Sequence, residues 1–291
     1  MNRNIAFIGV GIMGLGLVKN LKNKEVQLHL YSRDIKKIKA LEDGNTKIFD
    51  SVSATIKDSN IIILCLTEDA IVEDIFFNQG ILKHSNTLIL DFGTTSPKLT
   101  KKMHKAASEK GIRFFDCPMT GSKIAADSGE IVFMFGGTEN EAKDIQFILD
   151  ACGKKTFFCG EVGKGQEMKI ALNMVQAGLM QVYMEGLTLA NKLGLDPKLF
   201  QELISNSAAK SGISEFKLNY ILNQDYSTNF SLKNMNKDLN HALDLMNKTN
   251  AALPLTSTLK SIYNAGMSAN LGEEDFCSLF KINEKLNNTI A

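Results

Sequence analysis

IAFIGVGIMGLGLVKNL, residues 5–21, predicts the architecture of the first half of the chain. Its first six residues are almost all apolar, which is typical of a strand buried on both faces of a parallel sheet. A helical pattern follows over 13–23, with Leu15, Val18 and Leu21 on one face. A strand that passes through a short glycine turn into a helix is the opening unit of a doubly wound α/β domain.

The turn in this stretch has the spacing G-x-G-x-x-G, which suits a bound dinucleotide. Gly9 permits the tight turn, Gly11 leaves room for a pyrophosphate, and Gly14 lets helix and strand pack closely. The N-terminus of the following helix favours an anion. The same spacing occurs in plain turns, but here it follows a strand and opens a helix. We therefore predict cofactor contacts from the whole turn, which comprises Gly9, Val10, Gly11, Ile12, Met13 and Gly14.

The end of the second predicted strand, at 26–31, indicates which dinucleotide binds. An acidic residue at this position would bond the ribose 2′-hydroxyl of NAD, but the chain continues Tyr31-Ser32-Arg33-Asp34. Arg33 can face a 2′-phosphate with a charge-assisted fork, and Ser32 can donate its hydroxyl. Asp34 comes too late in the turn and is expected to cap the next helix. We predict NADP; the alternative is NAD, with Arg33 a solvated surface residue.

Short apolar runs alternate with amphipathic ones as far as residue 152, which predicts βαβ units around a parallel sheet. From 163 to 193 the chain contains no proline and is rich in Ala, Met, Leu and Gln, so one long helix is expected. Further helical patterns follow at 197–208, 232–248, 255–270 and 273–288. The prediction is a Rossmann domain over 1–162 and an all-α domain over 163–291, joined by the long helix.

The composition excludes several classes of protein. A net charge of +1 offers no general attraction for nucleic acid or an anionic membrane, and no apolar run approaches the length of a membrane span. The N-terminus enters a strand at once, without the features of a signal peptide. The five cysteines form no C-x-x-C pair and the four histidines show no metal-ligand spacing. We expect a cytoplasmic protein without a metal site.

Five motifs occur in order and together carry a family resemblance. They are GVGIMG (9–14), DFGTTSP (91–97), DCPMTGSKIAADSGE (116–130), GKGQEMKIALN (163–173) and FSLKNMNKDL (230–239). With them the chain resembles the β-hydroxyacid dehydrogenase family along essentially its whole length. The Gly121-Ser122-Lys123 stretch and Glu274-Asp275-Phe276 look most like the glyoxylate/succinic semialdehyde reductase branch, which typically uses NADPH.

The resemblance implies roles for residues outside the glycine turn. It implies an active site between the two domains, with Lys169 as the catalytic lysine and Asn173 beside it. The other implied cofactor contacts are Leu66, Thr67, Thr94 and Lys237. The implied substrate-binding residues, besides Lys169 and Asn173, are Thr120, Gly121, Ser122, Phe230 and Asp238. The chain departs from the usual pattern at Thr67, Gly93, Met119 and Thr120, and none of these changes removes the catalytic group.

Lys169 suits the chemistry that the family carries out. Hydride transfer to a carbonyl carbon leaves charge on oxygen, and a general acid within reach can supply the proton. A lysine can act in both directions if burial or a nearby cation such as Lys237 lowers its pKa. Asn173 follows one helical turn later, on the same face. The alternative for Lys169 is an ordinary solvated lysine near the start of a helix. His241, four residues after Lys237, could share its face, but we predict a structural role for it.

The sequence therefore predicts NADPH-dependent reduction of a small aldehyde acid, glyoxylate or succinic semialdehyde. The alternative within this class is a 3-hydroxyisobutyrate or tartronate semialdehyde dehydrogenase that uses NAD or NADP. Phosphogluconate dehydrogenases are much longer, and imine reductases usually lack the lysine. A non-catalytic NADP-binding module would be expected to lose Lys169 or the 120–122 loop, and both are present. The resemblance also implies a homodimer or homotetramer paired through the helical domains.

Overall fold

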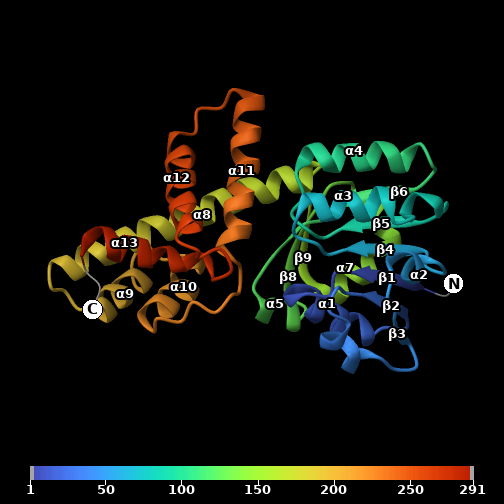
Figure 1. Ribbon diagram of the computed structural model, residues 1–291, viewed down its shortest axis with the longest axis horizontal. Helices are drawn as coiled ribbons and strands as arrows, with labels where there is room; N and C mark the ends of the chain where they lie inside the picture. Colours follow the sequence, from blue (N-terminus) through green and yellow to red (C-terminus); the bar gives the residue numbers. More distant parts are fainter. Residues whose placement is uncertain (1–2, 289–291) are drawn as a thin grey trace. The chain divides into compact units, whose positions relative to one another are not determined.

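The computed structural model describes residues 3–288, and the chain divides into two compact units, Met1–Lys169 and Ile170–Ala291. The division falls inside one continuous helix, α8 (Lys164–Lys192). The predicted boundary between residues 162 and 163 lies just before the first residue of this helix. Figure 1 shows the strands in the first unit and only helices in the part of the chain that follows α8.

Six parallel strands form the main sheet of the first unit (Figure 1), in the order β3-β2-β1-β4-β5-β6. They are β1 (Asn4–Ile8), β2 (Gln27–Tyr31), β3 (Thr46–Ile48), β4 (Ile61–Leu64), β5 (Leu88–Asp91) and β6 (Arg113–Asp116). Successive strands are added on one side of β1 as far as β3, and on its other side from β4 onward, so the strand order reverses between β1 and β4. In open α/β sheets, ligands bind at such a switch point, outside the carboxyl ends of the strands. The predicted Rossmann architecture is confirmed.

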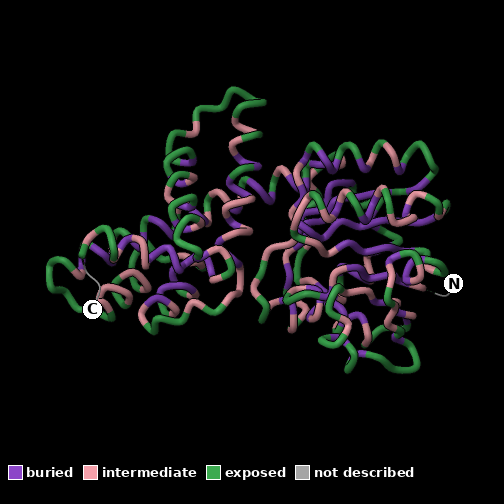
Figure 2. The backbone as a smooth tube through the Cα atoms, viewed as in Figure 1, coloured by how far each residue is buried: buried purple, intermediate pink, exposed green. Residues whose placement is uncertain are grey.

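Two apolar clusters cover the two faces of this sheet. Ile5 and Phe7 of β1 join the cluster that includes helices α1 (Ile12–Lys22) and α7 (Gln146–Cys152). Ala6 and Ile8, which point to the opposite face, join the cluster of α2 (Val52–Ile56), α3 (Asp69–Asn78) and α4 (Pro97–Ser108). Figure 2 shows the strands as largely buried between these layers. Burial on both faces explains why the strands are continuous apolar runs.

A second, three-stranded sheet follows the main one. It contains β7 (Met119–Thr120), β8 (Ile131–Phe135) and β9 (Gly153–Phe158), with β7 antiparallel and β9 parallel to β8. The short helix α5 (Lys123–Asp127) lies between β7 and β8 in the chain. The apolar run EIVFMF (130–135) predicts a strand at β8, whereas GKKTFF (153–158) has no such run and predicts none at β9.

Some predicted helices are shorter or broken. Ile35, Ile38 and Leu41 predict a helix at 35–43, where the structure has a 3₁₀ helix, η1 (Ile35–Leu41). The stretch TENEAKDIQFILDAC (138–152) predicts one helix, but it forms three pieces, α6 (Glu139–Ala142), η3 (Lys143–Ile145) and α7. A further 3₁₀ turn, η2 (Ile81–Lys83), follows α3. Because 3₁₀ and α-helices place apolar residues at similar spacings, the sequence pattern does not separate them.

The second unit is helical, as predicted. After α8 come α9 (Pro197–Ser205), α10 (Gly212–Leu222), α11 (Leu232–Thr249), α12 (Pro254–Ser268), η4 (Phe276–Leu279) and α13 (Phe280–Asn287). Its core includes Met184, Leu239 and Tyr263. Helix α8 has 29 residues, about 43 Å at 1.5 Å per residue. Neither α8 nor another helix within residues 3–288 carries an apolar stretch sufficient to cross a membrane.

Candidate functional site

A cavity of about 560 Å³ opens at the carboxyl ends of β1, β2 and β4. This volume is in the range of small-molecule and cofactor sites, and the place is the topological switch point of the sheet. The predicted cofactor residues that line it are Gly9, Val10, Gly11, Ser32, Arg33, Leu66 and Thr67. The rest of the glycine turn, Ile12, Met13 and Gly14, lies in the first turn of α1 and does not line the cavity.

The geometry of the glycine turn fits a pyrophosphate. Gly9 has φ +101°, a left-handed conformation, and a Cβ there would overlap the carbonyl oxygen of Cys65. A Cβ on Gly14 would come 2.5 Å from the carbonyl oxygen of Gly9, so the close packing of α1 on β1 requires glycine. At Gly11 a Cβ would meet nothing within 4 Å. The open space therefore lies beside Gly11, next to the N-terminal amides of α1, where an anion is favoured.

The residues after β2 present two cations to the same cavity. Arg33 is exposed and lines it, and so does Lys37, one turn later in η1. Asp34 stands at the N-cap position of η1 but makes no capping hydrogen bond; its Oδ2 lies 3.4 Å from Lys37 Nζ. The expectation that Asp34 would cap this helix is wrong. The sequence did not single out Lys37, because Arg33 lies before η1 and no helical spacing relates the two residues.

The loop predicted to bind a carboxylate joins β7 to α5. Thr120 pairs with Val132 at the end of β7, and Gly121 follows with φ +149°. Ser122 is the N-cap of α5, and its Oγ accepts a hydrogen bond from Ala125 N at 3.3 Å. Lys123 pairs with Asp127 at 2.7 Å on the exposed face of α5. The Ser122 hydroxyl proton is not used in this capping bond and can still be donated to a ligand.

Lys169 lies in the second turn of α8 and only 6% of its surface is exposed. It is therefore not the solvated surface lysine of the alternative reading. Asn173 follows one helical turn later and is 1% exposed. A buried amine and a buried amide at this spacing face the same side of the helix.

Asn173 belongs to a buried polar group in the second unit. Its Nδ2 donates to Asp238 Oδ2 at 2.6 Å, and Lys237 Nζ lies 3.0 Å from Asp238 Oδ1. Because the amide nitrogen faces the carboxylate, the orientation of the Asn173 side chain is assigned, and its Oδ1 points the other way. Asn173 Oδ1 is buried and has no hydrogen-bond partner among the described residues. A buried acceptor of this kind calls for a donor from a ligand or water.

Phe230 and His241 lie in the same unit. Phe230 is half-buried just before α11, and its ring packs edge-on against Phe276 at 6.2 Å. Its backbone N–H donates to Asp275 Oδ2 at 3.0 Å. His241 is 9% exposed, one turn after Lys237 on α11. Thr94 lies in the first unit, in the loop between β5 and α4.

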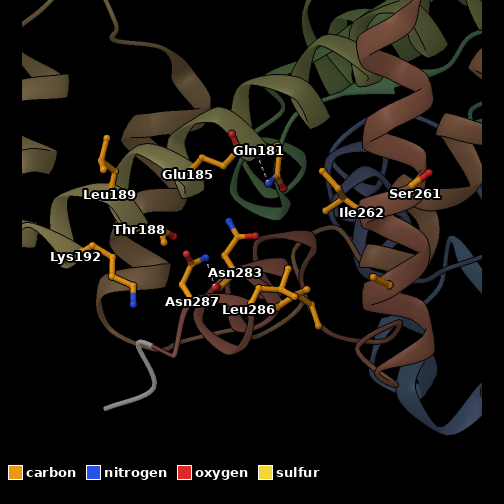
Figure 3. A pocket seen from close by; sticks show the side chains of 12 residues that line it. Gln181, Glu185, Thr188, Leu189, Lys192, Ser261, Ile262, Asn283, Leu286 and Asn287 are labelled. Atoms are coloured by element: carbon orange, nitrogen blue, oxygen red, sulfur yellow. Dashed lines mark hydrogen bonds between the residues drawn. The ribbon is translucent and has the colours of Figure 1, made fainter.

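Another cavity, of about 570 Å³, lies in the helical unit between α8, α12 and α13 (Figure 3). Gln181 and Glu185 of α8 line it, joined by a hydrogen bond of 2.8 Å, together with Asn283 of α13. None of the predicted site residues lines this cavity. Within residues 3–288 no cluster of His, Cys, Asp and Glu side chains could hold a metal ion.

Comparison with known proteins covers both units. Residues 4–160 match the NAD-binding domain of 6-phosphogluconate dehydrogenase, and residues 163–282 match the NAD-binding domain of NADP-dependent 3-hydroxyisobutyrate dehydrogenase. Mitochondrial 3-hydroxyisobutyrate dehydrogenase of Drosophila melanogaster is 32% identical, over 97% of this chain and 90% of the relative. Glyoxylate/succinic semialdehyde reductase 1 of Arabidopsis thaliana is 26% identical, over 95% and 97%.

A solved structure has the same fold. The 3-hydroxyisobutyrate dehydrogenase of Mycobacterium tuberculosis, solved with L-serine, superposes with a TM-score of 0.85 at 26% identity, over 97% of this chain and 99% of that one. The matches thus extend through the strand-rich unit and the helical unit alike. With a relative at 32% identity across almost its full length, the chain belongs to the β-hydroxyacid dehydrogenase family of NAD(P)-dependent oxidoreductases.

Proposed function

We propose that this enzyme reduces a small aldehyde acid, glyoxylate or succinic semialdehyde, with NADPH. The observation that carries the proposal is the buried Lys169, one turn before an Asn173 whose amide is held by the buried carboxylate of Asp238. A buried lysine beside an oriented amide suits general acid catalysis. Because it is buried, it does not contribute to the solvated surface as an ordinary lysine would. The proposed domain roles are NADP binding by 1–162 and substrate binding and dimerisation by 163–291, with the 120–122 loop of the first domain also contributing to the substrate site.

In the proposed mechanism the residues of the chain supply the proton and the orientation. The nicotinamide, when bound, supplies the hydride that reaches the carbonyl carbon. The Lys169 ammonium donates a proton to the carbonyl oxygen, which completes the hydroxyl group; in the reverse direction the neutral amine removes it. Asn173 Oδ1 accepts from the Lys169 ammonium or the new hydroxyl, and Asp238 keeps the amide in that orientation. Thr120, Gly121 and Ser122 hold the carboxylate through hydroxyl and backbone donors.

The proposal assigns a class of substrate, the small aldehyde acids, and kcat/KM for each of them must show which one the enzyme prefers. Glyoxylate, succinic semialdehyde, methylmalonate semialdehyde and tartronate semialdehyde all carry the carboxylate and carbonyl that the site requires. We expect kcat/KM with NADPH to be highest for glyoxylate or succinic semialdehyde. The relatedness to 3-hydroxyisobutyrate dehydrogenases at 32% identity supports the second candidate, for which methylmalonate semialdehyde would be best. Absence of NADPH oxidation at 340 nm with every member of the panel would rule out the proposal.

Arg33 is proposed to select NADP over NAD. The change Arg33→Ala removes a cation from the cavity wall, so KM for NADPH should rise about 10- to 100-fold while KM for NADH changes little. This corresponds to about 1.5–3 kcal/mol for a charge-assisted hydrogen bond. Steady-state kinetics with both cofactors measure the effect. Lys36→Ala is a matched control, because Lys36 is an exposed cation three residues after Arg33, in η1, and does not line the cavity. An equal loss with both cofactors would argue against this role.

We further propose that copies of the chain associate as a homodimer or homotetramer through the helical unit. Large apolar side chains stand exposed along α8 and α9 of this unit, among them Val175, Val182, Leu189, Leu199 and Leu203. Helix α9 has no fully buried residue at all. An apolar groove of about 450 Å³ also runs between α8 and the start of α12. Exposed apolar surface of this extent supports association.

A further inference from the structure

Two buried carboxylates stand side by side at the carboxyl ends of β5 and β6. Asp91 and Asp116 are register partners in the sheet, and both are 0% exposed. Within residues 3–288 neither forms an ion pair with a lysine or arginine; backbone and amide groups donate hydrogen bonds to them instead. Burial raises the pKa of both carboxyl groups, that of Asp91 to about 7. Such an arrangement is costly for stability alone, and an apolar pair would pack more simply.

Asp116 caps the helix that carries Lys169. Its Oδ1 accepts from Gly163 N at 2.6 Å, and its Oδ2 accepts from Gln166 N at 2.8 Å. Gly163 immediately precedes α8 and Gln166 lies in its first turn, where the backbone N–H groups have no partner within the helix. A negatively charged acceptor there also complements the helix dipole. One carboxylate, from a strand 47 residues earlier in the sequence, therefore fixes where α8 begins.

Gln166 connects the same helix to the loop that contains Thr94. Its side chain is 0% exposed: Oε1 accepts from Thr95 N at 3.1 Å, and Nε2 donates to Gly93 O at 2.9 Å. Nε2 also lies 3.4 Å from Asp91 Oδ2, and Asp91 Oδ1 accepts from Gly93 N at 3.0 Å. The residues on both sides of Thr94 are thus bonded to one amide from α8.

The packing around this network leaves no room for adjustment. A Cβ on Gly165 would overlap the carbonyl oxygen of Met134 and come 2.8 Å from Asp116 Oδ2. A Cβ on Gly136 would overlap the Asp116 carboxylate from the other side. The start of α8 therefore lies in close contact with both β8 and the end of β6, and its position follows from the network.

We propose that Gln166, held between Asp91 and Asp116, is a positioning residue that couples the Thr94 loop to the turn of α8 carrying Lys169. This inference rests on the proposed function, because it assigns Thr94 to the cofactor and Lys169 to proton transfer. Gln166 precedes Lys169 by three residues, so any shift of the first turn moves the amine. A displacement of about 1 Å at reacting groups can reduce the rate about 100-fold.

Three variants test the coupling. Gln166→Leu keeps the volume but removes all three side-chain hydrogen bonds, and kcat should fall about 10- to 100-fold with KM for NADPH changed less than threefold. Gln166→Glu is an isostere of the amide only when protonated, since only then can it donate to Gly93 O. The ratio of its kcat to that of the wild type should approach one at low pH and fall as the buried acid ionises, so the two pH profiles should differ. Glu167→Gln is the matched control, because the Glu167 side chain bonds Lys101 and Lys164 and makes no hydrogen bond to Asp91, Asp116 or Gln166.

The outcomes separate the inference from the proposed function. Wild-type kcat and an unchanged pH profile in Gln166→Glu would overturn the inference, and this variant decides the matter if Gln166→Leu does not fold. If the wild type reduces none of the aldehyde acids, the proposed function fails. In that case amide hydrogen exchange of the native protein still tests the coupling. Gln166→Leu should speed exchange at both Thr95 and Gly163 relative to Glu167→Gln, and unchanged exchange at Thr95 would overturn it.

Discussion

Replacing Lys169 with alanine is expected to lower kcat/KM for reduction of the aldehyde acid by about 10²- to 10⁴-fold, the usual contribution of a positioned general acid. The variant loses the donor that would neutralise charge on the carbonyl oxygen. Affinity for NADPH should change less than threefold, since the cavity at the ends of β1, β2 and β4 is formed by other residues. Fluorescence titration of NADPH and initial rates at 340 nm give the two numbers separately.

The control for this variant is Lys164→Ala. Lys164 opens the same helix and is exposed, and its Nζ lies 2.7 Å from Glu167, so its loss removes an equal charge without touching the buried group. Activity of Lys164→Ala should stay within about twofold of the wild type, because exposed ion pairs contribute little. Partial rescue of Lys169→Ala by a small alkylamine in solution would support proton transfer by the missing group. A Lys169→Ala enzyme that retains most of its reductase activity would exclude the role.

The sequence was sufficient to predict those parts of the fold that depend on local pattern. The glycine turn, the apolar strands and the proline-free stretch after residue 163 each predict one element, and β1, α1 and α8 lie where expected. The pieces of the 138–152 segment could not be separated by periodicity. Thr138 and Glu141 form a capping box that starts α6, but η3 interrupts the helix after one turn. Strand β9 depends on pairing with β8, a contact between residues about twenty apart in the sequence.

The candidate site was predictable only where a motif has a mechanism of its own. The glycine turn and Arg33 predict a dinucleotide phosphate through conformation and charge, and Gly9, Gly11 and Arg33 line one cavity. Asp91, Asp116 and Gln166 each belong to a different one of the family motifs. Nothing in the local sequence shows that their side chains contact one another. Gln166 reaches Thr95 across 71 positions and Asp91 across 75. Tertiary contacts over such separations come from the packing of the sheet, which a single sequence does not reveal.

The helical unit contains one ion pair on which its stability should depend. Lys217 and Asp275 are 2.7 Å apart with side chains 3% and 0% exposed. The change Lys217→Met should lower the free energy of unfolding by about 3–5 kcal/mol, because it leaves Asp275 buried without its cation. The rings of Phe216, Tyr220 and Phe276 also surround the Lys217 ammonium, at 4.7, 5.5 and 5.0 Å. These contacts are lost in the same substitution.

The loss of stability in Lys217→Met should extend to the segment before α11. Asp275 Oδ2 also accepts from the backbone N–H groups of Asn229 and Phe230, each at 3.0 Å, and Oδ1 accepts from Cys277 N at 3.2 Å. Without the ammonium, an ionised Asp275 keeps these hydrogen bonds, but its buried negative charge is no longer balanced by a cation. The 229–232 segment should therefore loosen first. Hydrogen exchange in this segment should therefore accelerate more than in the first unit, and denaturant unfolding followed by circular dichroism gives the free energy.

Lys281→Met is the comparison that distinguishes burial from charge. Lys281 also forms an ion pair in this unit, with Glu274 at 2.6 Å, but its side chain is 37% exposed and that of its partner 36%. Its loss should cost less than about 1 kcal/mol, as for other pairs in contact with water. Adding Asp275→Asn to Lys217→Met should recover part of the stability, since the uncompensated charge disappears. If Lys217→Met and Lys281→Met lower the free energy of unfolding equally, the buried pair does not stabilise the unit as argued. The same follows if the double variant loses more free energy of unfolding than the two single changes add up to.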